Sequence, residues 1–353
     1  MGGTERMLLT LLSSLKNDGN GHVVYTLFRP GPLYKNFLRE GIRVRPLNLP
    51  NPLFIFAVPI LLWEIFAKKP DIIESYLLAD NIVSRILGKI TGTKTISGKR
   101  DTDKGKKGWK VFLDKATLGF ADLHISNSNA GKKELLAYGV PGNNIRVIHN
   151  GKAFPEIPAS AGAQFRSKNG ISNKDFVLGN IARLQPFKGQ EYLIRALPEI
   201  ISKIPTVKLV LVGGGPDIMR LSELCKRLRI ENNVFFAGQL ENVYPALCSF
   251  DLFVFPSLRE GLPGSLMEAM GCGIPCIASR VDGCIELINN ESDGILVEPM
   301  NPRQISDKVV ELYSNVEKRK RIAKKAKKKM REGFSITKMA EAYLDAYSSL
   351  ADS

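Results

Sequence analysis

One stretch of the sequence, residues 255–270 (FPSLREGLPGSLMEAM), restricts the fold more than any other. It follows the apolar run 251–255, which reads as a buried parallel strand, and it leads into a helix through a loop of glycine and proline. Gly261, Pro263 and Gly264 allow a tight turn that directs the free N–H groups of the helix toward the space above the sheet. An anionic ligand is the natural occupant of that space.

Two carboxylates border this expected anion site. Glu260 lies just before the loop and Glu268 lies in the first turns of the helix, where each could hold sugar hydroxyl groups. An ordinary connection between a strand and a helix, with two surface glutamates, would show the same spacing, because short motifs are frequent by chance. The residues around the glutamates favour the first interpretation, in which the loop and both carboxylates bracket a nucleotide-sugar.

The run EGLPGSLMEAMGCGIPCIAS, with seven residues between its first two glutamates, resembles the signature of the family 4 retaining glycosyltransferases. The resemblance implies an α/β protein of GT-B fold, in which two Rossmann-like doubly wound domains face a central cleft and a C-terminal helix crosses back to the N-terminal domain. It also implies roles for individual residues. Glu260 would contact the sugar, Glu268 the ribose hydroxyls, and the backbone of residues 264–266 the diphosphate.

A second cluster follows the strand predicted at residues 177–181. Arg183 and Lys188 flank the turn after this strand, and a helical pattern of apolar residues comes next. Arginine can grip a phosphate with two parallel hydrogen bonds, and lysine supplies a mobile point charge, so the pair suits a leaving diphosphate. The resemblance implies the same role for both. Either residue alone would more often be a solvated basic side chain.

A third strand, 207–212, runs into Gly213, Gly214 and Gly215, which permit a ligand to approach the backbone closely. The spacing of these glycines is not that of a dinucleotide-binding fingerprint. Near the next strand, the resemblance places the nucleobase close to Leu240. The residues predicted to contact the donor are therefore Gly2, Gly3, Gly213, Gly215, Leu240, Gly261, Leu262, Pro263, Gly264, Ser265, Leu266 and Glu268.

The length of 353 residues makes two domains the default, and strands that alternate with amphipathic helices indicate a doubly wound α/β class. Prolines and small residues between 150 and 164 break the periodicity. We therefore expect an acceptor-binding domain at residues 1–155, a domain that binds the nucleotide-sugar at 156–333, and a helix at 334–353 that packs back on the first domain.

Two departures from the family pattern concern the first domain. Gly2 and Gly3 resemble the glycine turn that follows the first strand in these enzymes, but only Met1 precedes them. That strand is central in a doubly wound sheet, so its absence would leave two neighbours without partners, and truncation or a wrongly assigned start would explain it. The second departure is the segment 95–103, which lacks the histidine of many members; there Asp101, or Arg100, is expected to orient the sugar or the acceptor.

The net charge of +15 comes mainly from two segments. Residues 318–331 hold ten Lys/Arg and no acid, and residues 99–110 hold six Lys/Arg and two Asp. Such runs are usually solvated helix faces, but attraction to an anionic membrane surface is the sharper hypothesis.

The apolar segment 53–66 is too short to span a bilayer, and we expect it to be buried against the sheet rather than to lie in the membrane plane. No nucleic-acid motif is present.

The five cysteines have no signal peptide ahead of them, which favours a reduced cytoplasmic protein. No metal site is expected, because no histidine or second cysteine pair accompanies Cys272 and Cys276.

We expect a retaining transferase with catalytic residues Arg183, Lys188, Glu260 and Asp101. It would take a UDP- or GDP-sugar, use no obligatory cofactor, and glycosylate a sugar or lipid-linked saccharide. A sugar-nucleotide binder without activity, or a GT-B isomerase or phosphorylase, remains the alternative.

Overall fold

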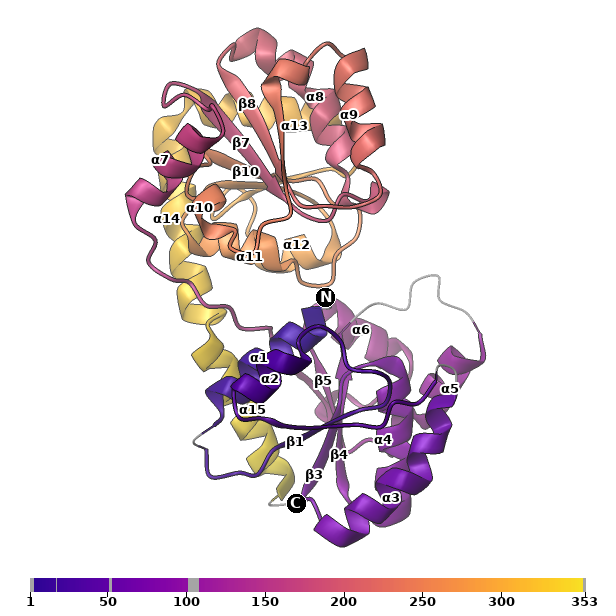
Figure 1. Cartoon of the computed structure of the whole chain (residues 1–353). Coiled ribbons are helices and arrows are strands. Elements are labelled where there is room, and N and C mark those ends of the chain that lie inside the picture. The colour runs from indigo at the N-terminus through magenta and orange to yellow at the C-terminus, as the bar shows by residue number, and fades with distance from the viewer. Residues whose placement is uncertain (1–2, 17, 51–52, 101–107, 352–353) are drawn as a thin grey trace. The chain divides into compact units, whose positions relative to one another are not determined.

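The computed structural model describes residues 3–16, 18–50, 53–100 and 108–351. The chain divides into unit 1, with residues 1–151 and 336–353, and unit 2, with residues 152–335 (Figure 1). The division falls a few residues before the expected boundary. The reason is local, because the Lys152 N–H donates a hydrogen bond to the carbonyl of Phe334 at 2.9 Å, which joins the start of unit 2 to its end.

Unit 2 is built on one parallel sheet with the strand order β12-β11-β10-β7-β8-β9. Both faces of the sheet are covered, and every residue of β7 and β10 is buried. The central strands therefore read as nearly continuous apolar runs in the sequence. The strands are β7 (Phe176–Ile181), β8 (Val207–Val212), β9 (Val234–Gly238), β10 (Leu252–Phe255), β11 (Cys276–Ser279) and β12 (Ile295–Val297).

Helices cover both faces of this sheet. One apolar core lies under α8, α9 and α13, and a second lies under α10, α11, α12 and α14. The helices of unit 2 are α7 (Ala159–Lys168), α8 (Gln190–Lys203), α9 (Ile218–Arg227), α10 (Tyr244–Leu247), α11 (Gly264–Gly271), α12 (Asp282–Leu287), α13 (Pro302–Ser314) and α14 (Val316–Gly333). This three-layer arrangement is the doubly wound architecture that the alternation of elements predicts.

Unit 1 contains parallel strands in two sheets, one with β1 and β2 and one with the order β3-β4-β5-β6. Within the described residues β1 pairs with β2 alone and β3 with β4 alone, so each has one unpaired edge. The strands are β1 (Val23–Thr26), β2 (Arg43–Pro46), β3 (Ile72–Ser75), β4 (Lys94–Lys99), β5 (Leu123–Ser126) and β6 (Ile145–Val147). The helices are α1 (Gly3–Ser14), α2 (Tyr34–Arg39), α3 (Ala57–Lys68), α4 (Leu78–Thr91), α5 (Trp109–Thr117), α6 (Asn129–Ala137) and α15 (Ile336–Ala351).

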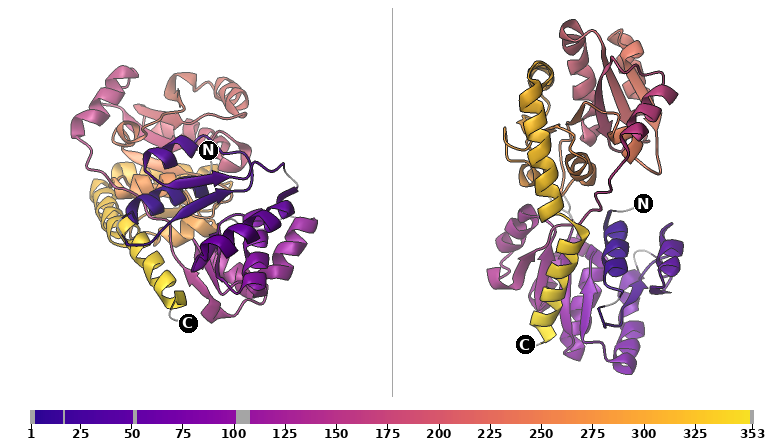
Figure 2. Two further views of the ribbon diagram at one scale, coloured as in Figure 1. Left: turned by 60° about the horizontal axis from the view of Figure 1, so that its bottom comes forward. Right: turned by 90° about the vertical axis from the view of Figure 1, so that its left-hand side faces the viewer.

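Helix α15 is the C-terminal helix, and it belongs to unit 1, as predicted (Figure 2). Its residues Met339, Tyr343 and Ala346 are buried in a core shared with α1 and with strands β4 and β5. Polar contacts fix it further, because the Tyr347 hydroxyl donates to the Glu74 carboxylate at 2.6 Å and the Arg100 guanidinium donates to the Tyr343 hydroxyl. The chain therefore returns to its first unit through a helix that completes the core of that unit.

The apolar segment 53–66 is only partly buried. Ala57 and Ile65 lie in the core of unit 1, whereas Phe56, Trp63 and Phe66 have exposed fractions of 57%, 69% and 63%. The expected burial against the sheet thus holds for one side of α3 and is wrong for the other. Among the described residues, no helix is both long and apolar enough to cross a membrane.

Candidate functional site

The candidate site lies in unit 2, where β7 and β10 are neighbours in the sheet. From β7 the chain continues outward through β8 and β9, and from β10 it continues in the opposite direction through β11 and β12. The loops after two such strands diverge, and in open α/β sheets ligands bind in the crevice at this point. The two motifs that the sequence singled out leave the sheet here, one after β7 and the other after β10.

The loop after β7 carries the predicted cations. Arg183 is exposed, and its side chain makes no hydrogen bond or ion pair to any described residue. Lys188 closes a short 3-10 helix, Pro186–Lys188, and Gly189 follows with a positive φ of 70°. A Cβ atom at Gly189 would lie 2.0 Å from the carbonyl oxygen of Pro256. Glycine is therefore required for this loop to lie directly against the loop after β10.

Hydrogen bonds hold the two loops together. Between the loops, the Leu258 N–H donates to the Phe187 carbonyl at 2.8 Å; within the sheet, the buried Asn180 side chain of β7 donates to the Val254 carbonyl of β10 at 2.8 Å. These contacts bring the Lys188 ammonium within 2.6 Å of a Glu260 carboxylate oxygen, with side-chain exposures of 18% and 10%. The structure thus places two predicted catalytic residues in one half-buried ion pair, which sequence alone did not indicate.

Helix α11 begins where the anion site was predicted. Pro263, in extended conformation, occupies the N-cap position and makes no side-chain hydrogen bond to the helix. The first N–H groups of any α-helix have no partner within the helix, so those of residues 264–266 remain available. The Leu266 side chain is fully buried, and only its backbone can therefore contact a ligand. Uncapped amides and the helix dipole both favour an anion at this point.

One further residue belongs to the site and was not predicted. The Lys152 ammonium lies 2.6 Å from a Glu268 carboxylate oxygen, and the ends of its side chain lie 3.2 Å from the position that a Cβ of Gly264 would occupy. Lys152 and Glu268 are 116 residues apart in the sequence, and Lys152 stands in a connecting segment without periodicity. No local pattern could have found it.

The glycines after β8 have a packing role. A Cβ at Gly213 would lie 2.0 Å from the Ala182 carbonyl oxygen, and one at Gly215 would lie 2.2 Å from that of Leu184. Both glycines therefore let this loop rest on the turn that carries Arg183. Leu240, expected near the nucleobase, is half-buried just beyond the edge strand β9. Gly261 accepts close packing from Gly283 of α12, while Leu262 and Ser265 are half-buried.

The predicted residues of unit 1 are only partly described. Gly2 and Asp101 lie outside the described residues, and Gly3 is the exposed first residue of α1. Arg100, the alternative to Asp101, turns toward the interior of unit 1, where its guanidinium donates to Tyr343 and to the Asn150 side chain and lies 5.0 Å from the centre of the Tyr76 ring. Arg100 therefore fixes α15 to its own unit.

Two family models match the chain and together cover most of it. The model described as "Glycosyl transferases group 1" matches residues 163–329, and the model described as "Glycosyltransferase Family 4" matches residues 1–151. The chain belongs to the family 4 glycosyltransferases. The resemblance inferred from the glutamate motif is thereby confirmed.

Individual relatives agree with this assignment. The glycosyltransferase is 31% identical to N-acetyl-alpha-D-glucosaminyl L-malate synthase of Bacillus anthracis over 184 residues, which are 52% of this chain and 48% of that protein. It is 29% identical to UDP-Gal:alpha-D-GlcNAc-diphosphoundecaprenol alpha-1,3-galactosyltransferase of Escherichia coli over 314 residues, 82% of this chain and 78% of that protein. Anabaena HepE, solved in complex with UDP, superposes with a TM-score of 0.89 at 23% identity, covering 99% of this chain and 96% of that one. The GT-B fold is thus confirmed.

The possible metal ligands and the thiols of the glycosyltransferase can be compared with the requirements of metal binding and of nucleophilic attack. Within the described ranges, no group of three or more His, Cys, Asp or Glu side chains is placed to hold a metal ion. All five cysteines are free thiols, and burial raises the pKa of Cys272 to about 12 and that of Cys225 to about 11. A thiol with such a pKa is a poor nucleophile at neutral pH.

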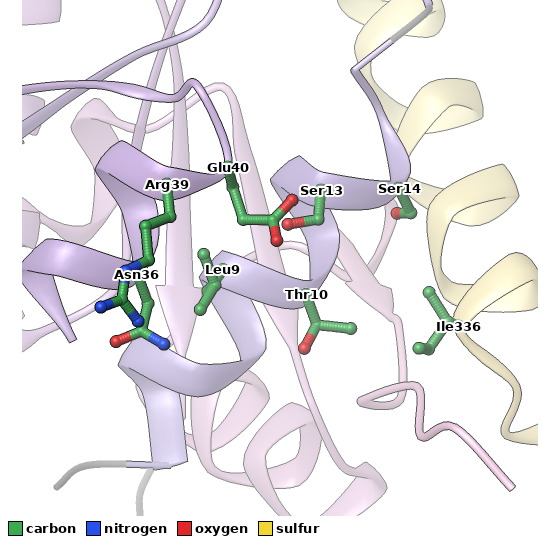
Figure 3. Close-up of a pocket in the computed structure, with 8 residues that line it drawn as sticks. All are labelled: Leu9, Thr10, Ser13, Ser14, Asn36, Arg39, Glu40 and Ile336. Atoms are coloured by element: carbon green, nitrogen blue, oxygen red, sulfur yellow. The ribbon is translucent and has the colours of Figure 1, made fainter. Parts of the chain in front are cut away.

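A cavity of about 650 Å³ lies in unit 1 of the glycosyltransferase, between α1, α2 and the start of α15 (Figure 3). Its lining includes Ser13, Asn36 and Arg39, and Glu40 at its border pairs with Lys16 at 2.6 Å. None of the predicted site residues lines it. The cavity and the candidate site of unit 2 therefore share no residue.

Proposed function

We propose that the protein is a retaining glycosyltransferase that moves a sugar from a nucleoside diphosphate sugar to an acceptor hydroxyl group. The observation that carries the proposal is the meeting of two loops at the divergence of β7 and β10. One loop brings Arg183 and Lys188, and the other brings Glu260, the uncapped start of α11 and Glu268. Cations, free amides and two carboxylates on one sheet edge match the parts of such a donor.

Each part of the donor has a chemical counterpart in unit 2. The amides of residues 264–266 would accept the diphosphate, with Arg183 and Lys188 beside it. Glu268 would accept hydrogen bonds from the ribose hydroxyls and Glu260 from those of the transferred sugar. Negative charge grows on the diphosphate as the glycosidic bond breaks, so fixed cations there lower the barrier; one well-placed donor of this kind is typically worth about 3–4 kcal/mol.

Lys188 and Glu260 form an ion pair with each other, and we propose that both also contact the donor. Each group satisfies the other at 2.6 Å while neither is fully solvated. An incoming donor offers a phosphate to the ammonium and hydroxyl groups to the carboxylate, so both charges gain new partners on the ligand. Because the fold already removes most of the solvent from both groups, contact with a ligand adds little further desolvation cost.

Retention of configuration would follow if the acceptor attacks from the face that the diphosphate leaves. The departing phosphate oxygen then lies next to the acceptor hydroxyl and can take its proton, so no histidine base is required. We propose that the positive charge comes from Arg183 and Lys188 and that no metal is obligatory. Asp101 is proposed to orient the sugar or acceptor, and Gly2 and Gly3 to lie near the transferred sugar.

The relatives guide the choice of donor and acceptor. HepE was solved with UDP and with UDP-glucose, and the Escherichia coli relative is named for UDP-galactose and an acceptor linked to diphosphoundecaprenol. We therefore propose a UDP-hexose donor, with a GDP-sugar as the second choice, and a saccharide acceptor, free or lipid-linked, bound by unit 1. A role in polysaccharide or glycolipid assembly follows from such an acceptor.

We also propose a peripheral position on an anionic membrane, at its cytoplasmic face, supported first by α14. This helix buries Ile322, Ala326 and Met330 and exposes a stripe of basic residues on another side. The basic stripe consists of Lys320, Arg321, Lys324, Lys325 and Lys328. Each basic residue near an anionic bilayer contributes about 1 kcal/mol to binding.

Exposed aromatic side chains in unit 1 give independent support. Besides those of α3, α5 exposes Trp109 (54%) and Phe112 (72%), and the Trp109 ring stacks on Phe54 with ring centres 5.7 Å apart. The Lys110 ammonium lies 5.4 Å from the centre of the Phe54 ring. Tryptophan and phenylalanine next to lysine are typical of surfaces that enter the headgroup region of a bilayer.

The membrane proposal is tested by sedimentation with liposomes at low salt. The wild-type protein should sediment with vesicles that contain anionic lipid and remain in solution with neutral vesicles. Changing Lys324, Lys325 and Lys328 to glutamine should weaken the interaction, and so should changing Trp63 and Phe112 to serine. Equal recovery with anionic and neutral vesicles would contradict the proposal.

The donor site is tested by thermal stabilisation and titration with a panel of nucleoside diphosphates and their sugars. One base should stabilise the protein, and Glu268→Gln should weaken binding of that nucleotide about 10-fold, the loss expected for hydrogen bonds to a charged group. Glu223→Gln, an exposed glutamate of α9, is the matched control and should change nothing. Unchanged affinity in Glu268→Gln would remove Glu268 from the site.

A further inference from the structure

We propose that Lys152 is a donor-binding residue with two tasks: it positions the Glu268 carboxylate for the ribose, and it brings a third positive charge to the diphosphate. The proposal rests on the proposed function of the site and adds a residue that the glutamate motif does not contain. Its starting point is geometric. One ammonium group lies 2.6 Å from Glu268 and also lies over Gly264, the first residue of α11.

The backbone around Lys152 is anchored to unit 2 at several points. Its N–H donates to the Phe334 carbonyl at 2.9 Å, and it forms a parallel bridge with Ser335. The next carbonyl, that of Ala153, accepts a hydrogen bond from the Tyr244 hydroxyl at 2.9 Å. These contacts come from the end of α14 and from α10, so the position from which the Lys152 side chain reaches α11 is fixed within the unit.

Phe154 completes the anchor. A Cβ at Gly271, the last residue of α11, would lie 2.0 Å from the Phe154 ring, so the ring rests directly on the helix backbone. The segment 152–154 therefore contacts α11 at both ends, with Lys152 at its first residue and Phe154 at its last. Such a clamp holds the helix start, and with it the predicted phosphate amides, in a constant place relative to Lys152.

Stability does not explain this lysine. The Lys152 and Glu268 side chains are 31% and 18% exposed, and ion pairs that remain in contact with solvent contribute little to folding. Binding gives a clearer reason. Glu268 stands in the second turn of a helix whose first turn is proposed to hold a diphosphate, and a carboxylate at that distance repels the ligand. An ammonium group placed against both positions removes the repulsion.

The two lysines of the site then have parallel roles. Lys188 pairs with Glu260 and Lys152 pairs with Glu268, each at 2.6 Å. Each proposed hydroxyl-binding carboxylate is thus held by one lysine, and Lys152 also lies against the first residue of α11. Lys152 acts on the ribose through Glu268 and on the diphosphate directly.

The test is titration of the full-length protein with the nucleoside diphosphate that binds the wild type most tightly. Lys152→Met should raise Kd about 10-fold or more, the loss expected for a charge-assisted hydrogen bond, whereas Lys152→Arg should retain most of the affinity. Lys226→Met, an exposed lysine of α9, is the matched control and should bind as the wild type does. Circular dichroism and the melting temperature of Lys152→Met should match the wild type.

A second comparison separates the two tasks. In a Glu268→Gln background, Lys152→Met should still raise Kd, because the contact with the diphosphate does not require the carboxylate. Disappearance of the effect in that background would overturn the direct contact. Unchanged Kd in Lys152→Met, with a wild type that binds, would overturn the whole inference and leave the proposed function intact. A wild type that binds no nucleoside diphosphate would instead overturn the proposed function.

Discussion

Replacing Gly189 with alanine tests how the two loops of the donor site are joined. Gly189 has a φ of 70°, a conformation that costs a residue with a side chain about 1–2 kcal/mol. The new Cβ would also lie 2.0 Å from the Pro256 carbonyl oxygen, well inside any allowed contact, so the loops must separate. Overpacking of this kind costs a further 1–3 kcal/mol, roughly. We expect a total loss of about 2–5 kcal/mol.

Gly170 provides the matched control, because it has a similar φ of 65° and no atom within 4 Å of its Cβ position. Gly170→Ala should therefore lose only the conformational part, about 1–2 kcal/mol. The assay is equilibrium urea unfolding, with hydrogen exchange and mass spectrometry on peptides from β7 and β10. Gly189→Ala should also bind nucleoside diphosphates more weakly, because Lys188 moves away from Glu260. Equal losses in the two variants would refute the close contact between the loops.

Three further predictions concern both units. Arg183→Met should lower kcat roughly 100-fold or more if this exposed cation stabilises the departing diphosphate, and an unchanged kcat measured by product formation would exclude that role. Arg85→Met should destabilise unit 1 by about 3–5 kcal/mol, because it leaves the buried Asp114 carboxylate without its partner at 2.7 Å. The fluorescence of Trp63 and Trp109, the only tryptophans and both in unit 1, reports this unfolding, and a loss of stability below 1 kcal/mol would contradict the prediction. Burial, and then the charge of Arg85, lowers the pKa of His124 from 6.5 to about 4. Between these pH values the unfolded state binds a proton that the folded state does not, so wild-type stability should fall by up to about 3 kcal/mol from pH 6.5 to pH 4. His124→Gln should lack this fall, and a pH profile of its stability parallel to that of the wild type would disprove the prediction.

The elements around the site could be predicted because each is a local pattern. The apolar run 251–255 gave the strand observed as Leu252–Phe255, and the glycine and proline residues after it marked the loop before α11. The C-terminal helix followed from its apolar spacing, and its return to the first domain followed from the family resemblance. Fold class and family are both confirmed.

The contacts within the site could not be predicted, because they join residues that are far apart in the sequence. Lys188 and Glu260 are 72 residues apart, and no local pattern indicates that they form an ion pair. Gly213 and Gly215, which are predicted to contact the donor, also lie against the backbone of the turn after β7, and the sequence did not indicate that contact. A glycine pattern shows that a close approach occurs but not which group approaches.

The exposure of α3 is a similar case. An apolar segment of this length favours burial, and periodicity alone does not show that Trp63 and Phe66 lie on a side of the helix that no described element covers. Whether another helix covers this side of α3 depends on how the whole unit folds, and the sequence of the segment does not contain that information. Local sequence therefore showed that the segment is apolar but not which of its side chains the rest of the unit covers.

The most direct test of the central claim needs no acceptor. Proton NMR can follow slow hydrolysis of UDP-glucose, UDP-galactose and GDP-mannose by the wild-type protein, and record the configuration of the sugar first released, before mutarotation. The account predicts that one donor is consumed, that the released sugar keeps the configuration it had in the donor, and that Lys188→Met and Glu260→Gln abolish the reaction. Release of the opposite anomer would contradict the retaining mechanism, and consumption of a donor at the wild-type rate by both variants would contradict the site.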